Sequence, residues 1–195
     1  DVIGHEHLCL WSLTSLLELV KNKGLDVFRV EYLSLNGGTR RFWLCGSMIR
    51  PIEKSVEEQL LREKQDLTVA AFNNFKADIQ WGKNDLVTFV HNEVTSGGKV
   101  FIYGASTRGN TILQTCGLDS NFIAGAAEIS QDKIGKVIAG LNIPIVSEEE
   151  ARRQATAFLV LPYSYREEFI KREQPFLDRG GKLVFPLPTF EVVRK

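Results

Sequence analysis

The second half of the chain alternates short apolar runs with polar and amphipathic segments, and this alternation constrains the fold more than any other feature. The apolar runs have the length of buried strands, and helical segments lie between most of them. Strands interleaved with helices are joined by right-handed crossovers and form a parallel, doubly wound sheet. We therefore predict an α/β fold with a Rossmann-like sheet over residues 99–195. Its strands are expected at residues 99–104, 122–130, 143–147, 155–162 and 182–188.

The first 98 residues carry a different pattern and divide into two regions. Residues 12–24 place leucines on one helical face before a glycine, and two β-rich stretches around an Asn-Gly-Gly turn follow. This predicts a helix-hairpin unit within residues 1–50. Residues 51–98 have helical spacing and predict a long helical connector. Its apolar stripe is expected to be packing, and it comprises Leu60, Leu61, Leu67, Ala71, Phe75, Ile79, Leu86, Phe89 and Val90.

Composition and charge exclude several classes of partner. The chain is 44% hydrophobic and 25% charged, as in ordinary globular proteins. Its 24 basic and 24 acidic residues cancel, so no field attracts nucleic acid or an anionic membrane. No apolar run approaches the roughly 18 residues of a membrane span. The three cysteines are scattered and form no CxxC, which favours reduced, mostly buried thiols and a cytoplasmic location.

A glycine-containing loop follows the first strand of the predicted sheet and opens a helix, the position of a phosphate-binding loop. Its glycines, Gly104 and Gly109, do not complete the GxGxxG pattern, and no Walker lysine is present. Helix N-terminal amides still attract an anion there, and Arg108 adds a cation. Glu128 ends the next strand, where a dinucleotide fold places its ribose-binding acid. The loop from Gly104 to Asn110 therefore predicts a weak nucleotide site; the alternative is a tight turn without a ligand.

Two of the three histidines flank a glutamate near the start of the chain, in the order His5-Glu6-His7. This is not the HExxH pattern, and with no further histidine nearby and every cysteine isolated we do not expect a metal site. A histidine titrates near neutral pH, and a neighbouring carboxylate can orient it or hold its proton. The cluster therefore favours an acid/base role; ordinary surface residues are the alternative.

The hairpin turn carries a second polar group. Residues 35–42 place the amide of Asn36, two glycines, a hydroxyl and two arginines around the turn. One interpretation is a solvent-facing turn of the hairpin. The other is a loop of close approach, in which the Arg40 guanidinium binds phosphate or sugar oxygens.

Taken in order, these motifs resemble those of the sugar C-methyltransferases, S-adenosylmethionine-dependent enzymes of deoxysugar biosynthesis that act on nucleotide-linked ketosugars. No single motif is decisive, but their occurrence in the same order is fairly specific. The resemblance runs from about residue 2 to residue 188. It is carried by GHEHLCLWSL, GLDVFRVEYLSLNGGTRR, YGASTRGN, EISQDKIG, IPI, LPYS and GGKLVFPLP.

The resemblance implies that this chain is the substrate-binding C-terminal region of such an enzyme. The zinc-binding segment and the S-adenosylmethionine domain of the family are not found in it, so we expect it to be inactive alone. In the family a ketosugar is deprotonated beside its carbonyl. The match makes His7 the candidate base and Glu6 its partner, with His5 nearby. The residues that the resemblance and the motifs together assign to substrate binding are Asn36, Arg40, Gly104, Arg108, Asn110, Glu128 and Lys133.

Three departures from the family pattern remove polar groups. Gly4 replaces a tyrosine, Asn36 replaces a histidine and Ser164 replaces an asparagine. A changed substrate or a changed chemistry would follow from the first two. Two other functions are therefore kept beside the methyltransferase. One is a Rossmann-like module that binds a nucleotide or sugar phosphate without chemistry, and the other is a nicotinamide-dependent oxidoreductase, which the missing third glycine disfavours.

Overall fold

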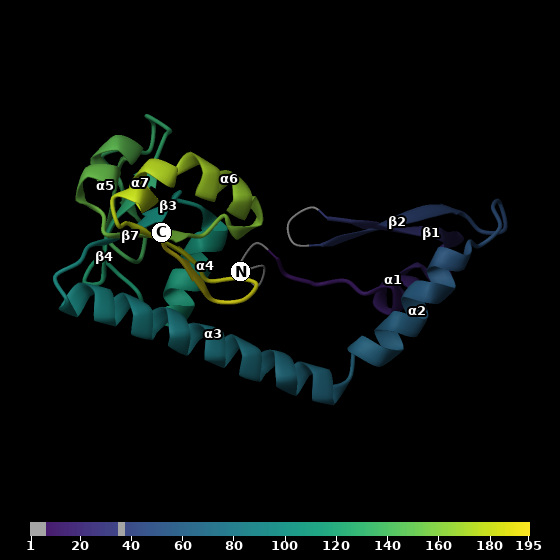
Figure 1. Ribbon diagram of the computed structural model, residues 1–195. Helices are drawn as coiled ribbons and strands as arrows, with labels where there is room; N and C mark the ends of the chain where they lie inside the picture. The colour runs from purple at the N-terminus through teal and green to yellow at the C-terminus, as the bar shows by residue number, and fades with distance from the viewer. Residues whose placement is uncertain (1–6, 35–37) are drawn as a thin grey trace. The chain divides into compact units, whose positions relative to one another are not determined.

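The computed structural model describes residues 7–34 and 38–195, which group into two compact units. One unit consists of residues 8–77. The other consists of residues 78–195 together with His7. The boundary between the units along the chain falls within α3 (Val69–Thr95), which is the longest helix in Figure 1. The expected division into residues 1–50, 51–98 and 99–195 stays a prediction, and each unit is described by itself below.

The N-terminal unit contains the helix and the hairpin that the sequence predicts. The two strands pair antiparallel, with Val30 opposite Phe42. One face of the hairpin packs on the helices through a small core built around Leu13, Val27 and Val56. The elements are α1 (Leu13–Val20), β1 (Leu25–Leu33), β2 (Thr39–Gly46), α2 (Lys54–Asp66) and the first turns of α3.

A buried carboxylate joins α2 to the start of α1. Ser12 caps α1 by accepting a hydrogen bond from the Ser15 N–H. The Glu63 carboxylate of α2 accepts two more, from the N–H groups of Leu13 at 2.7 Å and Thr14 at 2.9 Å. The first N–H groups of a helix have no partner within the helix, so these bonds satisfy donors that burial would otherwise penalise. Glu63 therefore holds the two helices of this unit together.

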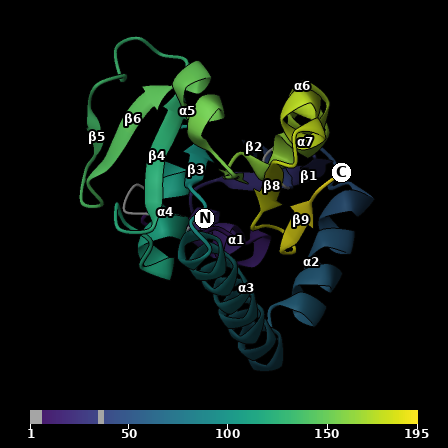
Figure 2. The same ribbon diagram turned by 60° about the vertical axis from the view of Figure 1, so that its left-hand side comes forward.

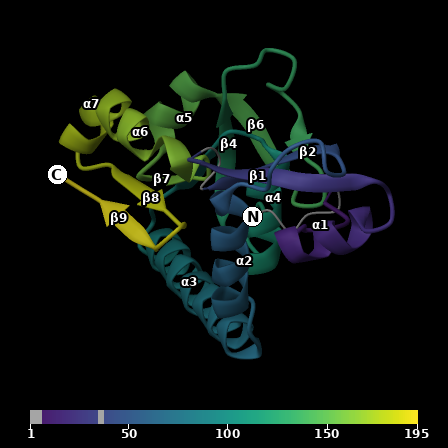
Figure 3. The ribbon, with the colours of Figure 1, turned by 90° about the vertical axis from the view of Figure 1, so that its right-hand side faces the viewer.

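The C-terminal unit is built on a seven-stranded sheet of order β5-β6-β4-β3-β7-β8-β9. The five inner strands are parallel, which confirms the predicted Rossmann-like sheet. Figure 2 shows β5, β6, β4 and β3 in succession, and Figure 3 shows β8 beside β9. The two edge strands, β5 and β9, are antiparallel and were not predicted. The strands are β3 (Val100–Tyr103), β4 (Ile123–Glu128), β5 (Val137–Ile138), β6 (Ile143–Ser147), β7 (Ala157–Val160), β8 (Lys182–Phe185) and β9 (Glu191–Val193).

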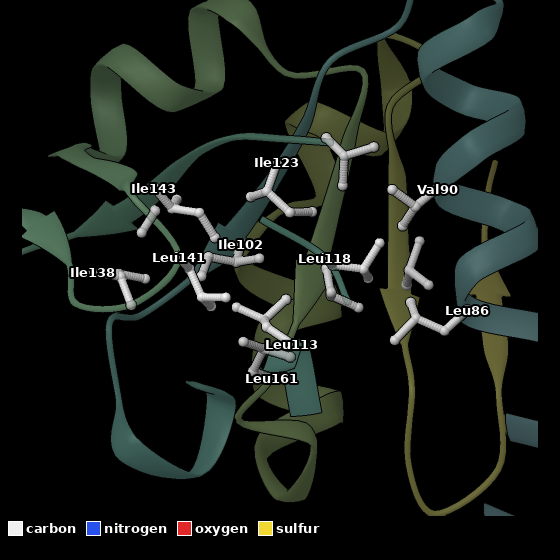
Figure 4. Packing of buried hydrophobic residues seen from close by; sticks show 14 of the residues in the cluster. Leu86, Val90, Ile102, Leu113, Leu118, Ile123, Ile138, Leu141, Ile143 and Leu161 are labelled. Atoms are coloured by element: carbon white, nitrogen blue, oxygen red, sulfur yellow. The ribbon is translucent and has the colours of Figure 1, made fainter. Parts of the chain in front are cut away.

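Helices cover both faces of this sheet, as a doubly wound fold requires. Side chains alternate along β3: Ile102 faces a core cluster with Leu86 of α3 and Leu113 of α4, whereas Phe101 faces a second cluster with Phe176 of α7. Figure 4 shows the first cluster. The helices and the short 3-10 turn of this unit are α3, α4 (Thr107–Cys116), α5 (Glu148–Gln154), η2 (Tyr163–Tyr165), α6 (Arg166–Arg172) and α7 (Gln174–Asp178).

The apolar stripe of the helical connector is only partly buried, which corrects the expectation that it is all packing. Leu86 and Val90 are buried, but Phe75 and Ile79 are 53% and 43% exposed. The reason is length: α3 has 27 residues and extends about 40 Å, whereas a four-residue strand spans only about 13 Å. The sheet therefore covers only the later turns of the helix.

Two further expectations need correction. Residues 164–181, between the last two predicted strands, have helical spacing and are expected to form one helix, but the structure divides this segment into η2, α6 and α7. Pro175, which has no N–H to donate, lies at the start of α7, the position where a helix tolerates proline. The cysteines are also less buried than expected: Cys9 is exposed, and Cys45 and Cys116 are partly exposed.

Candidate functional site

The candidate site lies where neighbouring strands of the large sheet send their connections to opposite faces. β3 continues into α4 on one face, whereas β7 continues into η2 and α6 on the other. The two strands are adjacent and parallel. In open α/β sheets, ligands bind in the crevice at the carboxyl ends of two such strands. The predicted loop from Gly104 to Asn110 follows β3, so the fold places it at this switch point.

The loop and the first turn of α4 have the backbone geometry that suits an anion. Gly104 has φ +77°, a left-handed conformation that glycine adopts without strain. Ser106 caps α4 and accepts a hydrogen bond from the Gly109 N–H at 3.2 Å. The Oδ1 atom of Asn110 is buried and has no hydrogen-bond partner in the described part of the chain. An acceptor left in this state is costly, and a donor group on a ligand would satisfy it.

A hydrogen bond crosses the switch point and adds a tyrosine to the site. The Nη2 atom of Arg108 donates to the Tyr163 hydroxyl at 3.4 Å. Tyr163 follows β7, so the contact joins the two loops that border the crevice. Both side chains are partly buried, and the guanidinium lies in the first turn of α4. Sequence reasoning singled out Arg108 but missed Tyr163; its position directly after a predicted strand was the available signal.

The oxygens of the Glu128 carboxylate are already hydrogen-bonded to groups in and near the loop. Its oxygens accept hydrogen bonds from the N–H groups of Ala105 at 3.3 Å, Ile129 at 2.9 Å and Ser130 at 3.3 Å. The Lys133 ammonium donates to it at 3.1 Å and also to the Ala105 carbonyl at 3.2 Å. Burial alone would raise the pKa of Glu128, but Lys133 and the N–H groups outweigh it and hold the pKa below its usual value. Glu128 and Lys133 therefore hold the backbone of the loop in place through Ala105.

The other predicted site residues are placed as follows. His7 is exposed, whereas His5, Glu6 and Asn36 lie outside the described residues. Arg40 belongs to β2 of the N-terminal unit, where its guanidinium stacks 4.3 Å from the ring centre of Tyr32 and its Nε donates to Gln59. The loop after β3 thus brings together Gly104, Arg108, Asn110, Glu128 and Lys133.

The described residues contain neither a cluster suited to a metal ion nor a helix suited to a membrane. Within residues 7–34 and 38–195, no three or more His, Cys, Asp or Glu side chains are grouped so that they could hold a metal ion. No helix in these ranges is both long enough and apolar enough to cross a membrane.

An open, mostly parallel sheet with helices on both faces and a loop at its switch point defines a Rossmann-like α/β domain. Comparison with known families then gives the assignment: residues 34–188 match the family described as the C-methyltransferase C-terminal domain. The chain belongs to this family. It is also 29% identical over 197 residues to the C-methyltransferase NovU of Streptomyces niveus, a match that covers 99% of the chain and 47% of NovU. The chain therefore spans about half the length of this curated relative.

Proposed function

We propose that this chain is the substrate-binding C-terminal region of an S-adenosylmethionine-dependent C-methyltransferase that acts on a nucleotide-linked sugar. The observation that carries the proposal is the loop after β3, with Arg108 in the first turn of α4 at the switch point of the sheet. Family membership supports the methyltransferase part. The nucleotide-linked sugar rests on the order of motifs in the sequence and on the chemistry of this loop.

The loop suits the diphosphate of such a substrate. The N–H groups at the start of α4 point out of the helix and attract negative charge. Arg108 adds a fixed positive charge beside them, and a hydrogen bond to a charged group is worth about 1.5–3 kcal/mol. Tyr163 borders the crevice on the opposite side, and the buried acceptor of Asn110 suits a hydroxyl of the sugar and not a phosphate. Glu128 and Lys133 then have the role of holding the loop, and a ribose contact of Glu128 stays a prediction.

In the whole enzyme we assign the proton abstraction to His7. Removing the proton beside the sugar carbonyl turns that carbon into a nucleophile, as C-methylation needs. The group that does so must be partly neutral near pH 7, which an imidazole is. Glu6, next to it in the sequence, is proposed to orient the ring, with His5 as a further polar neighbour.

The described residues do not fit S-adenosylmethionine itself. Its sulfonium is a cation, and the loop presents the cation Arg108. The nearby carboxylate of Glu128 is already held by three N–H groups and Lys133. We therefore assign no contact with the methyl donor to these residues. About half of the curated relative lies outside the match, and we propose that the donor site belongs to the corresponding part of the whole protein.

Calorimetry on this chain tests the proposal directly. We expect uridine diphosphate or adenosine diphosphate to bind weakly, and S-adenosylmethionine to give no heat of binding. Binding of S-adenosylmethionine at micromolar concentration would overturn the assignment of the donor site to another part of the protein. If neither nucleotide binds at millimolar concentration, the loop is not a nucleotide site.

A further inference from the structure

The C-terminal unit has a second concave site next to the loop. A groove of about 660 Å³ lies between α3, α4 and the segment 186–190 that connects β8 to β9; Figure 2 shows these elements. This volume is within the range of sites for small organic ligands. On α4 the groove is lined from the second turn onward, by Thr111, Ile112, Thr115 and Cys116, and the segment 186–190 follows the parallel strand β8 at the carboxyl side of the sheet.

The lining of the groove favours a flat, uncharged ligand. Trp81 of α3 is 69% exposed, which is unusual for so large an aromatic side chain. Leu187 and Pro188 form an apolar wall. The charged side chains are two carboxylates, Asp78 and Asp85, and one ammonium, Lys83. This balance repels a phosphate, but the carboxylates can accept hydrogen bonds from the N–H groups of a heteroaromatic ring.

A glycine in the middle of α3 is unexplained by the fold alone. Gly82 lines the groove, and a Cβ added to it would meet no atom within 4 Å. Its backbone is not left-handed, so neither packing nor conformation requires glycine. Glycine inside a helix is destabilising relative to alanine. What the glycine does provide is open space beside Trp81, where a ligand can approach the helix backbone.

The groove continues from the anion-binding end of α4. Thr111 and Thr115 line it, and they lie one and two helical turns below Thr107, the first residue of the helix. One turn rises about 5.4 Å, so a ligand with its anionic end at the helix start reaches the groove within a few ångströms. Such a ligand is anionic at one end and flat and neutral at the other.

We propose that this groove binds the nucleobase of a nucleoside diphosphate whose phosphates lie at the start of α4, with Trp81 stacking on the base. The proposal rests on the proposed function, because it needs the diphosphate at Arg108. It extends that function by naming the part of the substrate that α3 recognises and the residues that do so. Base–aromatic stacking tolerates any base, so purine and pyrimidine probes should both bind.

Tryptophan fluorescence tests the contact. The chain has three tryptophans, and the variant Trp11→Phe/Trp43→Phe leaves Trp81 as the only one. We expect uridine diphosphate and adenosine diphosphate to change its emission with the same midpoint that calorimetry gives. Inorganic pyrophosphate, which carries no base, should compete for the loop and leave the emission unchanged.

Two substitutions in the groove should separate binding from folding. Gly82→Ala should raise the melting temperature by about 2–4 °C and weaken nucleotide binding at least threefold, with pyrophosphate binding unchanged. Trp81→Ala should weaken nucleotide binding about tenfold, and Trp81→Phe should restore most of it. Trp43→Phe, in the hairpin, is the matched control and should change neither.

The outcomes distinguish this proposal from the one it rests on. If both nucleotides bind and Arg108→Ala weakens them, but Trp81 emission and the Gly82→Ala affinity do not respond, the groove proposal is wrong and the anion loop stands. If no nucleotide binds, both are wrong. If Trp81 emission instead changes with protein concentration in the absence of nucleotide, the groove is occupied by a second copy of the chain, and the nucleobase assignment is overturned.

Discussion

Leu161 occupies the space that a side chain at Gly109 would need. A Cβ built on Gly109 would lie 2.6 Å from Cδ1 of Leu161 and 3.3 Å from its Cβ. Gly109 is in the first turn of α4, and Leu161 is the residue directly after β7. At Gly109, α4 therefore lies so close to the residue after β7 that only a hydrogen atom fits in place of a side chain.

The substitution Gly109→Ala should accordingly lower the free energy of unfolding. Overpacking of this kind costs about 1–3 kcal/mol, and urea unfolding measures it. Leu161→Ala alone should cost about 2–5 kcal/mol, because Leu161 is buried. In the double variant the added methyl group has room, so the loss should be smaller than the sum of the two single losses. Strict additivity would contradict the contact.

Arg108→Ala should weaken the binding of a nucleoside diphosphate about tenfold or more, since a charge-assisted hydrogen bond is lost. Calorimetry is the measurement, at fixed ionic strength because the interaction is screened by salt. Arg153→Ala is the matched control: Arg153 lies on α5, is exposed and forms an exposed ion pair with Glu149, four residues earlier on the same helix. Tyr163→Phe should have a smaller effect, because its bond to Arg108 is long. Equal effects of Arg108→Ala and Arg153→Ala would remove the loop from the site.

A buried ion pair between α5 and the start of α7 should control stability and its pH dependence. Glu173 is 2% exposed, and its carboxylate accepts two bonds from Arg152 at 2.8 and 2.9 Å. Burial would raise the pKa of Glu173, but the Arg152 guanidinium outweighs it and lowers that pKa. Glu173→Gln at pH 7 should therefore cost about 3–5 kcal/mol, whereas Glu149→Gln on the exposed side of α5 should stay within about 0.5 kcal/mol.

The sign of the pH effect follows from the direction of this shift. A carboxyl whose pKa is lowered in the folded state adds stability above its unfolded pKa, about 4.3 for glutamate. This contribution is lost as the pH falls through the lower, folded value. Denaturation curves at pH 7, 5 and 3 should thus show the difference between the native protein and Glu173→Gln shrink below about pH 4.5. A difference that grows in acid would contradict the ion pair.

His7→Asn in the whole enzyme should lower turnover at least about a hundredfold, since general-base help is typically worth 10² to 10⁴ in rate. Substrate affinity should change much less, because a base acts mainly in the transition state. Glu6→Gln should cost less, as it keeps the imidazole. Exchange of the substrate proton with deuterated solvent is the sharpest readout. Exchange at the native rate in His7→Asn would mean that another group is the base, and the absence of both turnover and exchange in the native whole protein would favour a binding-only module.

The large sheet and its loop could be predicted because their signals are local. The apolar runs, the turn residues and the loop before Thr107 lie within a few residues of the structure that they specify. The edge strands β5 and β9 were missed because they have two and three residues, too short for any periodicity. The exposure of Phe75 was not predicted, because an apolar stripe in the sequence indicates one face of a helix. It does not indicate how many turns of that helix the sheet is long enough to cover.

Site residues were harder to predict where their role depends on distant partners. Glu128 has the position of a ribose-binding acid, and only the fold shows that Ala105 and Lys133 already occupy its oxygens. Tyr163 is 55 residues from Arg108 in the sequence, and nothing in either motif indicates that they meet. Gly82 lies inside a helical pattern that glycine weakens. The sequence does not indicate that it lines a groove, which only the structure shows.

For the proposed nucleotide site, the hydrogen bonds that Glu128 and Lys133 make to the loop after β3 have a consequence for selectivity. A loop that is already held in its binding conformation loses little entropy when a ligand binds. The affinity is then not lowered by a population of molecules whose loop is in a conformation that cannot bind. Such a preorganised cradle cannot use an induced closure to tell one diphosphate from another. Discrimination among substrates must then come from the groups attached to the phosphates and from the fixed walls that receive them.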